Sequence, residues 1–144
     1  MVTTIPNNIK KEIWSNFEEF QPIFLATTEK DKPRVRPVTL AFLDSRFWVF
    51  TGTKDAKVKQ IRTNPKIEFC YLFKKGENSG YVRANGIAKI TQDQKIKEQM
   101  ANRCDYFDQH WKGPNDPNYT LLEFEIEEIE YMEPGKILAK KYRL

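Results

Sequence analysis

Residues 34–57 read RVRPVTLAFLDSRFWVFTGTKDAK, and this stretch decides the fold. It contains two apolar runs that are joined by the polar pair Asp44-Ser45. A short polar pair between two runs of this kind predicts a tight hairpin of antiparallel strands. Residues 47–50 are apolar at both odd and even positions, so both faces of this strand are expected to be buried. A barrel strand that is covered from outside by a helix or by a second subunit has this property.

On either side of this hairpin, alternating apolar positions predict further strands, and a 3.6-residue period predicts short helices. The six expected strands cover residues 23–28, 34–43, 47–51, 66–73, 81–91 and 119–132, and the three expected helices cover residues 9–20, 56–63 and 92–104. The apolar parity of the last strand shifts at Glu127-Glu128, which predicts a β-bulge there. The expected fold class is therefore mainly β, a six-stranded antiparallel barrel with short flanking helices.

The composition indicates a folded, soluble chain with one domain. Of its 144 residues, 31% are charged and 40% are hydrophobic, a balance that favours a globular core over disorder. We expect a single domain over residues 1–144, with the N-terminal helix inside residues 1–20 and a basic tail at residues 134–144. The chain has no signal-peptide pattern and no apolar run near the ~18 residues that span a bilayer, so a cytoplasmic protein is expected.

Two residue types that often bind metals give no sign of a metal site. Cys70 and Cys104 lack the spacing of metal ligands and lie among apolar residues, so two reduced core thiols are expected. His110 is the only histidine, which excludes a site with two histidine ligands. It remains open as a haem ligand or a proton donor, although an exposed surface histidine is the more common situation.

The net charge of +4 is divided among separate segments. Four basic residues and one acidic residue lie between Lys54 and Arg62, and the basic tail has no acidic residue. Six glutamates and no basic residue lie between Glu123 and Glu133. A nucleic-acid-binding protein more often has one broad basic face. A basic nucleic-acid-binding barrel is therefore the least favoured of the functions considered.

The hairpin stretch also contains candidates for binding an anion. Arg36 shares its strand face with apolar residues, so it needs either an anion or a route to water at the strand end. The segment Thr51–Lys57 offers hydroxyls, a glycine and two lysines where a strand leads into a helix. A helix N-terminus has free N–H groups and accepts a phosphate readily. An ordinary helix capped by Asp55, with solvated lysines, is the alternative.

The order of these motifs resembles the pyridoxamine 5'-phosphate oxidase-like, FMN-binding split-barrel family. The resemblance rests on Arg34-Val35-Arg36-Pro37-Val38, Phe47-Trp48-Val49-Phe50-Thr51, Lys54, Lys57, Asn64-Pro65, Ala84-Asn85-Gly86-Ile87-Ala88 and the glutamate-rich last strand. It covers roughly residues 20–132. It implies a split β-barrel that works as a homodimer, with FMN held between the two subunits.

The resemblance also implies a role for each matching residue. Arg36 and Lys57 correspond to the cations that hold the FMN phosphate, and Thr51 to a hydroxyl donor. The other cofactor-binding residues that it implies are Pro37, Val38 and Thr39 along the flavin ring, Gly52, Thr53 and Lys54 beside the ribityl-phosphate arm, and Phe107 and Trp111 against the flavin of the other subunit.

Two departures from the family pattern affect the expected function. Asp55-Ala56 stands where the family often has a serine-arginine pair, and an aspartate near a phosphate repels it unless the side chain turns inward as the N-cap. The C-terminal segment that grips pyridoxal phosphate in the true oxidase has no counterpart here. Oxidation of pyridoxamine phosphate is therefore not expected.

Three function classes remain in order of preference. The first is an FMN-dependent oxidoreductase that acts on a small substrate, in which the flavin transfers the electrons and the protein supplies position and electrostatics. The second is a sensor or carrier of the same fold that binds a flavin or haem without turnover. The third is the nucleic-acid-binding barrel. No side chain is identified as a general acid or base, and no membrane partner is expected.

Overall fold

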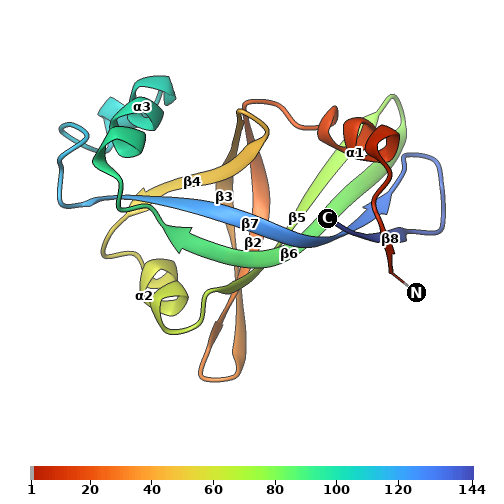
Figure 1. Cartoon of the computed structure of the whole chain (residues 1–144), viewed down its shortest axis with the longest axis horizontal. Coiled ribbons are helices and arrows are strands. Elements are labelled where there is room, and N and C mark those ends of the chain that lie inside the picture. The colour runs from red at the N-terminus through yellow and green to blue at the C-terminus, as the bar shows by residue number, and fades with distance from the viewer. Residues whose placement is uncertain (1) are drawn as a thin grey trace.

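The computed structural model describes residues 2–144, so Met1 of the expected N-terminal segment lies outside the described residues. The fold is mainly β, as expected, and Figure 1 shows its strands wrapped into a barrel. The strands are β1 (Thr3–Thr4), β2 (Phe20–Glu29), β3 (Lys32–Leu43), β4 (Arg46–Gly52), β5 (Lys66–Lys75), β6 (Asn78–Ile90), β7 (Tyr119–Met132) and β8 (Lys140–Arg143). The helices are α1 (Asn7–Trp14), α2 (Ala56–Thr63), α3 (Gln94–Arg103) and a 3-10 turn at Phe107–Gln109.

The sheet closes on itself through its two longest strands, β6 and β7. Its strand order is β1-β8-β7-β4-β3-β2-β5-β6, and β6 also pairs with β7. All pairings are antiparallel except the short one between β1 and β8. Closure removes most of the open edges that would otherwise promote aggregation. The helix α1 and the strand β8 lie at one end of the barrel, and α2 and α3 lie at the other (Figure 1).

The strand count differs from the sequence expectation. Six long strands are present as predicted, but two short strands, β1 and β8, bring the total to eight in residues 2–144. Part of the predicted basic tail forms β8, which pairs with β7 from Glu128↔Arg143 to Tyr131↔Lys140. The alternation in this tail covers only four residues, which is too short for a strand prediction. Opposite charges on β7 and β8 bring the two strands together, as in the 3.9 Å pair of Lys141 and Glu130.

The predicted N-terminal helix over residues 9–20 is too long. The helix α1 ends at Trp14, the chain then turns, and Phe20 begins β2. Asn16 closes the helix by donating its side-chain N–H groups to the carbonyls of Glu12 and Ile13. Phe17 still enters the core, where its ring stacks on Tyr71 at 5.0 Å. The helical spacing of apolar residues therefore continues past the end of α1, because the turn after the helix places Phe17 in the same core.

The predictions for α2 and for the turn at Asp44-Ser45 agree with the structure. The helix α2 covers residues 56–63 as predicted, and Asp55 caps it by accepting a hydrogen bond from the backbone N–H of Lys57 at 3.0 Å. The turn at Asp44-Ser45 has φ values of 57° and 59°, which is the left-handed geometry of a tight hairpin. Cys104 is buried, Cys70 is half-buried, and both are free thiols. Among residues 2–144, no helix combines the length and apolarity needed to cross a bilayer.

Strand β4 separates two hydrophobic clusters. Phe47 and Val49 point into the barrel core, whereas Trp48 and Phe50 point outward against α3 and the segment that follows it. All four side chains are buried within one chain, which confirms the prediction from residues 47–50. The cover on the outer face is a helix and not a second subunit. The burial of this strand therefore gives no support for a dimer.

The predicted bulge lies in β7 at Glu127. Asn85 pairs with Glu128 and Gly86 pairs with Ile126, so Glu127 is the extra residue of β7. At this point the two backbones come so close that a Cβ atom on Gly86 would overlap the carbonyl oxygen of Glu125. The bulge bends the long β6–β7 ribbon, which allows the barrel to close. A glycine is therefore required at position 86 by lack of space.

We predict that Gly86→Ala destabilises the fold by about 1–3 kcal/mol, because the new methyl group can be accommodated only if backbone atoms of β7 move. Urea unfolding followed by circular dichroism measures this difference. Gly113→Ala is the matched control, since no atom lies within 4 Å of the position of its Cβ. Equal stability of the two variants would contradict the close approach at the bulge.

Candidate functional site

The barrel is split between β3 and β4. These strands pair only at Ala41↔Trp48, Phe42↔Phe47 and Leu43↔Arg46. Beyond these pairs β3 continues against β2 alone, and β4 continues against β7 alone. Two strand edges with free backbone N–H and C=O groups therefore face the gap. Such groups need a partner, which is either water or a ligand with complementary donors and acceptors.

A pocket of about 300 Å³ occupies this split. It is lined by Pro37, Val38 and Thr39 of β3, by Val49, Phe50, Thr51 and Gly52 of β4, by Lys57 of α2, and by Tyr106, His110 and Trp111 of the segment after α3. Strand edges thus form two walls, the first turn of α2 contributes a cation, and aromatic rings form the remaining side. This combination suits a planar polar ring that carries an anionic arm.

The cation of the pocket is the ammonium group of Lys57. The side chain is only 8% exposed, and its Nζ donates to Thr51 Oγ1 at 2.8 Å and lies 3.0 Å from an Asp55 carboxylate oxygen. Burial alone raises the pKa of Asp55, but hydrogen bonds from Lys57 and its positive charge outweigh this and hold that pKa below its usual value. Asp55 is therefore the counterion of the buried lysine as well as the cap of α2.

Arg36 lies beside this cation and does not line the pocket itself. Its guanidinium donates to the carbonyl of Leu25 at 3.2 Å and to Gln60 Oε1 at 2.7 Å. Burial lowers the pKa of Arg36, and the nearby Asp55 carboxylate partly opposes this effect. Arg36 was expected to need an anion or a route to water. In the structure it is half-buried, and neutral oxygen acceptors orient its guanidinium. Gln60 was not identified from the sequence.

The aromatic residues of the pocket are held by hydrogen bonding and by ring packing. Trp111 is buried, and its indole N–H donates to the carbonyl of Asn118 at 2.9 Å. Tyr106 packs edge-on against Phe50 and Phe20, and burial raises the pKa of its phenol. His110 is exposed and stands at the mouth of the pocket beside Tyr106.

Seven of the eleven predicted site residues come together in this pocket. They are Pro37, Val38, Thr39, Thr51, Gly52, Lys57 and Trp111. The four others lie outside its lining. Thr53 bonds to Pro117 O and Thr120, Phe107 belongs to the outer hydrophobic cluster, Lys54 lies in the exposed turn before α2, and Arg36 is described above.

Four further residues line the pocket although none of them was among the eleven predicted ones, namely Val49, Phe50, Tyr106 and His110. Another missed residue, Gln60, had a weaker signal in the sequence. It lies three residues after Lys57 and therefore on the same face of α2, but a glutamine at that spacing is ordinary in a surface helix.

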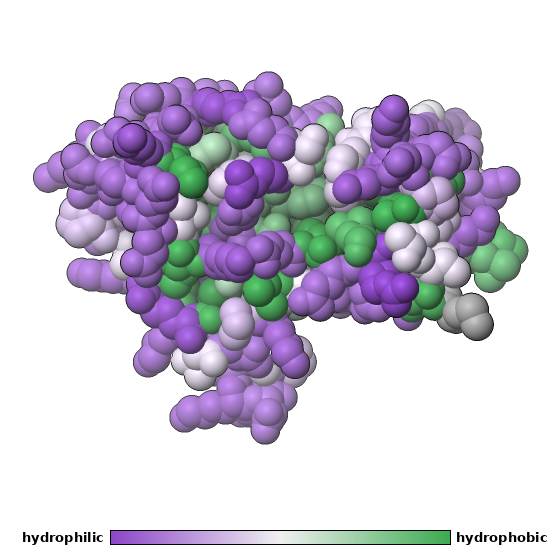
Figure 2. Space-filling view, viewed as in Figure 1, coloured by the Kyte–Doolittle hydropathy of each residue, from purple (hydrophilic) through white to green (hydrophobic). Residues whose placement is uncertain are grey.

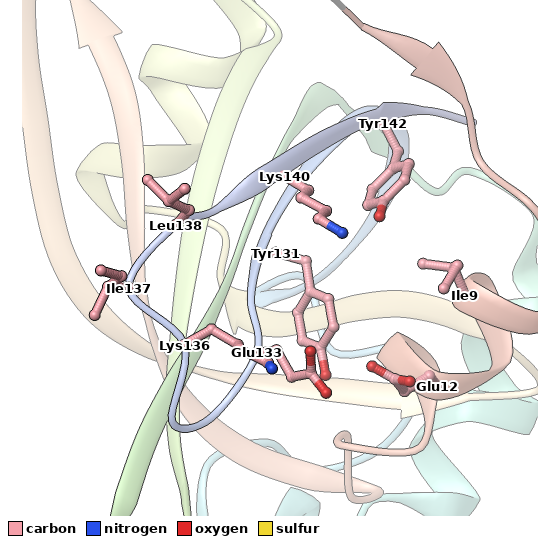
Figure 3. A pocket seen from close by; sticks show the side chains of 9 residues that line it. All are labelled: Ile9, Glu12, Tyr131, Glu133, Lys136, Ile137, Leu138, Lys140 and Tyr142. Carbon is pink, nitrogen blue, oxygen red and sulfur yellow. The ribbon is translucent and has the colours of Figure 1, made fainter.

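A second pocket, of about 330 Å³, lies at the opposite end of the barrel under the loop between β7 and β8 (Figure 3). Its lining contains none of the predicted site residues, and it combines the carboxylates of Glu12 and Glu133 with the ammonium groups of Lys136 and Lys140. Burial and a hydrogen bond with Glu12 raise the pKa of Tyr131 to about 12. Its lining residues come from α1, the end of β7, the loop that follows and β8, and none belongs to the strand edges of the split, so the split is the better candidate.

The split-barrel fold is that of a known family. The family model described as pyridoxamine 5'-phosphate oxidase matches residues 9–133. The chain therefore belongs to the pyridoxamine 5'-phosphate oxidase family, as the sequence motifs had suggested.

Individual relatives agree with this assignment. General stress protein 26 of Bacillus subtilis (strain 168) is 26% identical over 130 residues, which cover 90% of this chain and 91% of that protein. The structure of a haem binding protein from Mycobacterium smegmatis has a TM-score of 0.79 at 11% identity. The match covers 97% of this chain and 60% of that one. A pyridoxamine 5'-phosphate oxidase-related, FMN binding protein from Nostoc punctiforme PCC 73102 has a TM-score of 0.65 at 18% identity, covering 86% and 77%. These structures share the fold with this chain.

Proposed function

We propose that this chain is a flavoprotein that binds FMN in the split between β3 and β4 and functions as an oxidoreductase on a small substrate. The observation that carries the proposal is the convergence of seven predicted residues on one pocket with two open strand edges and a buried cation. The FMN binding protein from Nostoc punctiforme, which has the same fold, gives further support.

The chemistry of the pocket fits this cofactor. A flavin ring has an edge of alternating N–H and C=O groups, which matches the free backbone groups of β3 and β4. The phosphate would be held by Lys57, Thr51 and the N-terminus of α2, with Arg36 next to them. When bound, FMN supplies the acceptor and donor of electrons. The chain's own residues bind and orient it, and Tyr106 and His110 border the space left for substrate.

Asp55 opposes the phosphate in this arrangement. Its carboxylate already neutralises Lys57, so a phosphate must share that ammonium group or displace the carboxylate. The exposed side of Asp55 leaves room for such a movement, since the side chain is 47% exposed. FMN binding is therefore expected to be weaker than an unopposed lysine would give.

We propose that the chain forms a homodimer through the apolar face of the sheet next to the site. Phe24, Val35 and Leu72 are 54%, 69% and 63% exposed. Phe24 is the cross-strand neighbour of Pro37 and Cys70, so the face runs from β3 across β2 to β5. Within residues 2–144 these three side chains stay exposed to solvent, whereas Figure 2 shows hydrophilic side chains over much of the face that it views. A second copy packed here would bury this face and adjoin the site at Pro37.

Haem is a second candidate cofactor because of the position of His110. The imidazole is exposed at the mouth of the same pocket, where it could ligate an iron atom. The haem binding protein from Mycobacterium smegmatis shares the fold. Haem binding that competes with FMN and that His110→Ala abolishes would support this alternative.

The test of the proposed function is a titration of the cofactor-free protein with FMN and with riboflavin, followed by quenching of flavin fluorescence. We expect FMN to bind more tightly, because only FMN offers a phosphate to Lys57 and Arg36. Lys57→Ala and Arg36→Ala should each weaken FMN binding by about tenfold or more and change riboflavin binding little. Failure of both flavins to bind the wild-type protein would refute the proposal.

We also predict that Asp55→Ser binds FMN several-fold more tightly at low salt. At an effective dielectric of about 20, one unit charge at ~6 Å from a phosphate contributes about 3 kcal/mol before screening, and exposure reduces this several-fold. Serine caps a helix nearly as well as aspartate, but the substitution also removes the counterion of the buried Lys57, so the cofactor-free protein should lose about 1 kcal/mol or more of stability. The matched control is Asp93→Ser, which alters the N-cap of α3 instead. Unchanged or weaker binding by Asp55→Ser would place the phosphate elsewhere.

For the dimer, we predict that Phe24→Glu shifts the protein from dimer to monomer at micromolar concentration. The new charge would be buried in the proposed interface without a partner, which is strongly unfavourable. Light scattering after size-exclusion chromatography measures the mass. Ile137→Glu is the matched control, because Ile137 is equally apolar and 90% exposed but lies in the loop before β8 at the other end of the barrel. A monomeric wild-type protein would contradict the proposed interface.

A further inference from the structure

Gln60 is a buried polar residue whose side chain joins three elements. It lies on α2 three residues after Lys57, and it is 6% exposed. Its Oε1 accepts hydrogen bonds from Arg36 at 2.7 Å and from Thr27 Oγ1 at 2.6 Å. Both lone pairs of this oxygen are therefore in use. Its Nε2 points to Glu29 with a long contact of 3.5 Å. A glutamine in such a place orients its neighbours more than it contributes to apolar packing.

The effect of Gln60 on Arg36 is to fix its direction. The guanidinium group has five N–H donors in a planar fork. One N–H of Nη2 is held by Gln60 of α2, and one of Nη1 is held by the carbonyl of Leu25 on the neighbouring strand β2. With two points held, the plane of the fork is set, and its remaining donors are available to a ligand. An arginine held in this way loses little further entropy when it binds an anion.

The two cations near the site differ in how their charge is balanced. Lys57 is in contact with the carboxylate of Asp55, so this pair has no net charge. Both acceptors that hold Arg36 are neutral, and within residues 2–144 no carboxylate oxygen lies within 4.0 Å of its guanidinium nitrogens, whereas the Asp55 carboxylate is in direct contact with Lys57. Arg36 therefore carries the less compensated positive charge at this end of the barrel. An incoming anion gains more from Arg36 than from Lys57.

We propose that Gln60 is a positioning residue that presents Arg36, uncompensated and correctly oriented, to the phosphate group of the ligand. This inference rests on the proposed phosphate site. It adds that Arg36 is the principal anion-recognising cation and that recognition of the phosphomonoester depends on a residue that does not touch it. Lys57 and Asp55 then act as a neutral pair that the phosphate rearranges.

The amide of Gln60 is suited to this role because of its charge as well as its shape. Glutamate at position 60 would have almost the same shape, but it would form an ion pair with Arg36 and cancel the charge that attracts a phosphate. Leucine would have a similar volume but would leave Arg36 and Thr27 without their shared acceptor, so the guanidinium would lose its direction. The two substitutions therefore test charge and orientation separately.

The experiment measures the dissociation constants of FMN and riboflavin for the wild-type protein and for Gln60→Glu, Gln60→Leu and Gln99→Glu. Gln99 is exposed on α3, so its variant adds the same charge away from the site. We expect Gln60→Glu to reduce the preference for FMN over riboflavin by about tenfold or more, and Gln60→Leu to reduce it by a smaller factor. Gln99→Glu should keep the wild-type preference. Riboflavin binding should change little in all variants.

The outcomes separate this inference from the proposed function. If the wild-type protein binds neither flavin, the proposed function is wrong. If it prefers FMN but Gln60→Glu and Gln60→Leu keep that preference, the role of Gln60 is wrong while the function stands. A further comparison uses the phosphate cations themselves: Arg36→Ala should lose more of the FMN preference than Lys57→Ala. The reverse order would also overturn the inference. Circular dichroism and urea unfolding establish that each variant is folded before it is titrated.

Discussion

Strand β3 leaves β4 after three residue pairs, and the position of the site depends on this parting. Continued pairing would join the two backbone edges and close the pocket. β4 can keep its place without β3 because both of its faces are buried and β7 pairs with it along its length from Phe47 to Gly52. Because β4 is packed on both faces and paired with β7, its edge toward β3 can stay open. An open edge with fixed geometry is a suitable place for a planar ligand that can hydrogen-bond.

Electrostatics at the end of the split follow from the same geometry. The turn after β4 leads directly into α2, so Thr51, Asp55 and Lys57 meet at the N-terminus of that helix. A buried ammonium group without a counterion is unfavourable, and Asp55 supplies the counterion from the same turn. Arg36 comes from the opposite edge of the split and is balanced differently, by neutral acceptors. The site therefore combines a cation that is neutralised by contact with a carboxylate and a cation that is held by neutral acceptors.

Much of the fold followed from local patterns in the sequence. The hairpin at Asp44-Ser45, the limits of α2 and the bulge at Glu127 each depend on a few neighbouring residues, and each was predicted. The failures arose where a distant contact decided the outcome. The helix α1 ends early because Phe17 reaches the core from a turn, and β8 forms because β7 offers a complementary strand. The two-sided burial of residues 47–50 was predicted, but the sequence left open whether a helix or a subunit covers it. The structure places α3 there.

The sequence by itself determined which residues are available for chemistry: the Arg36-Pro37-Val38 strand, the Thr51–Lys57 turn and the capping by Asp55. These are properties of short segments, whose strand parity and helix N-terminus follow from local periodicity. Only the tertiary structure decided how their charges are balanced. The contact of Arg36 with Gln60 joins residues 24 positions apart, and the aromatic side of the pocket comes from residues 106–111. Such contacts depend on how the barrel closes, and no local pattern in the chain contains that information.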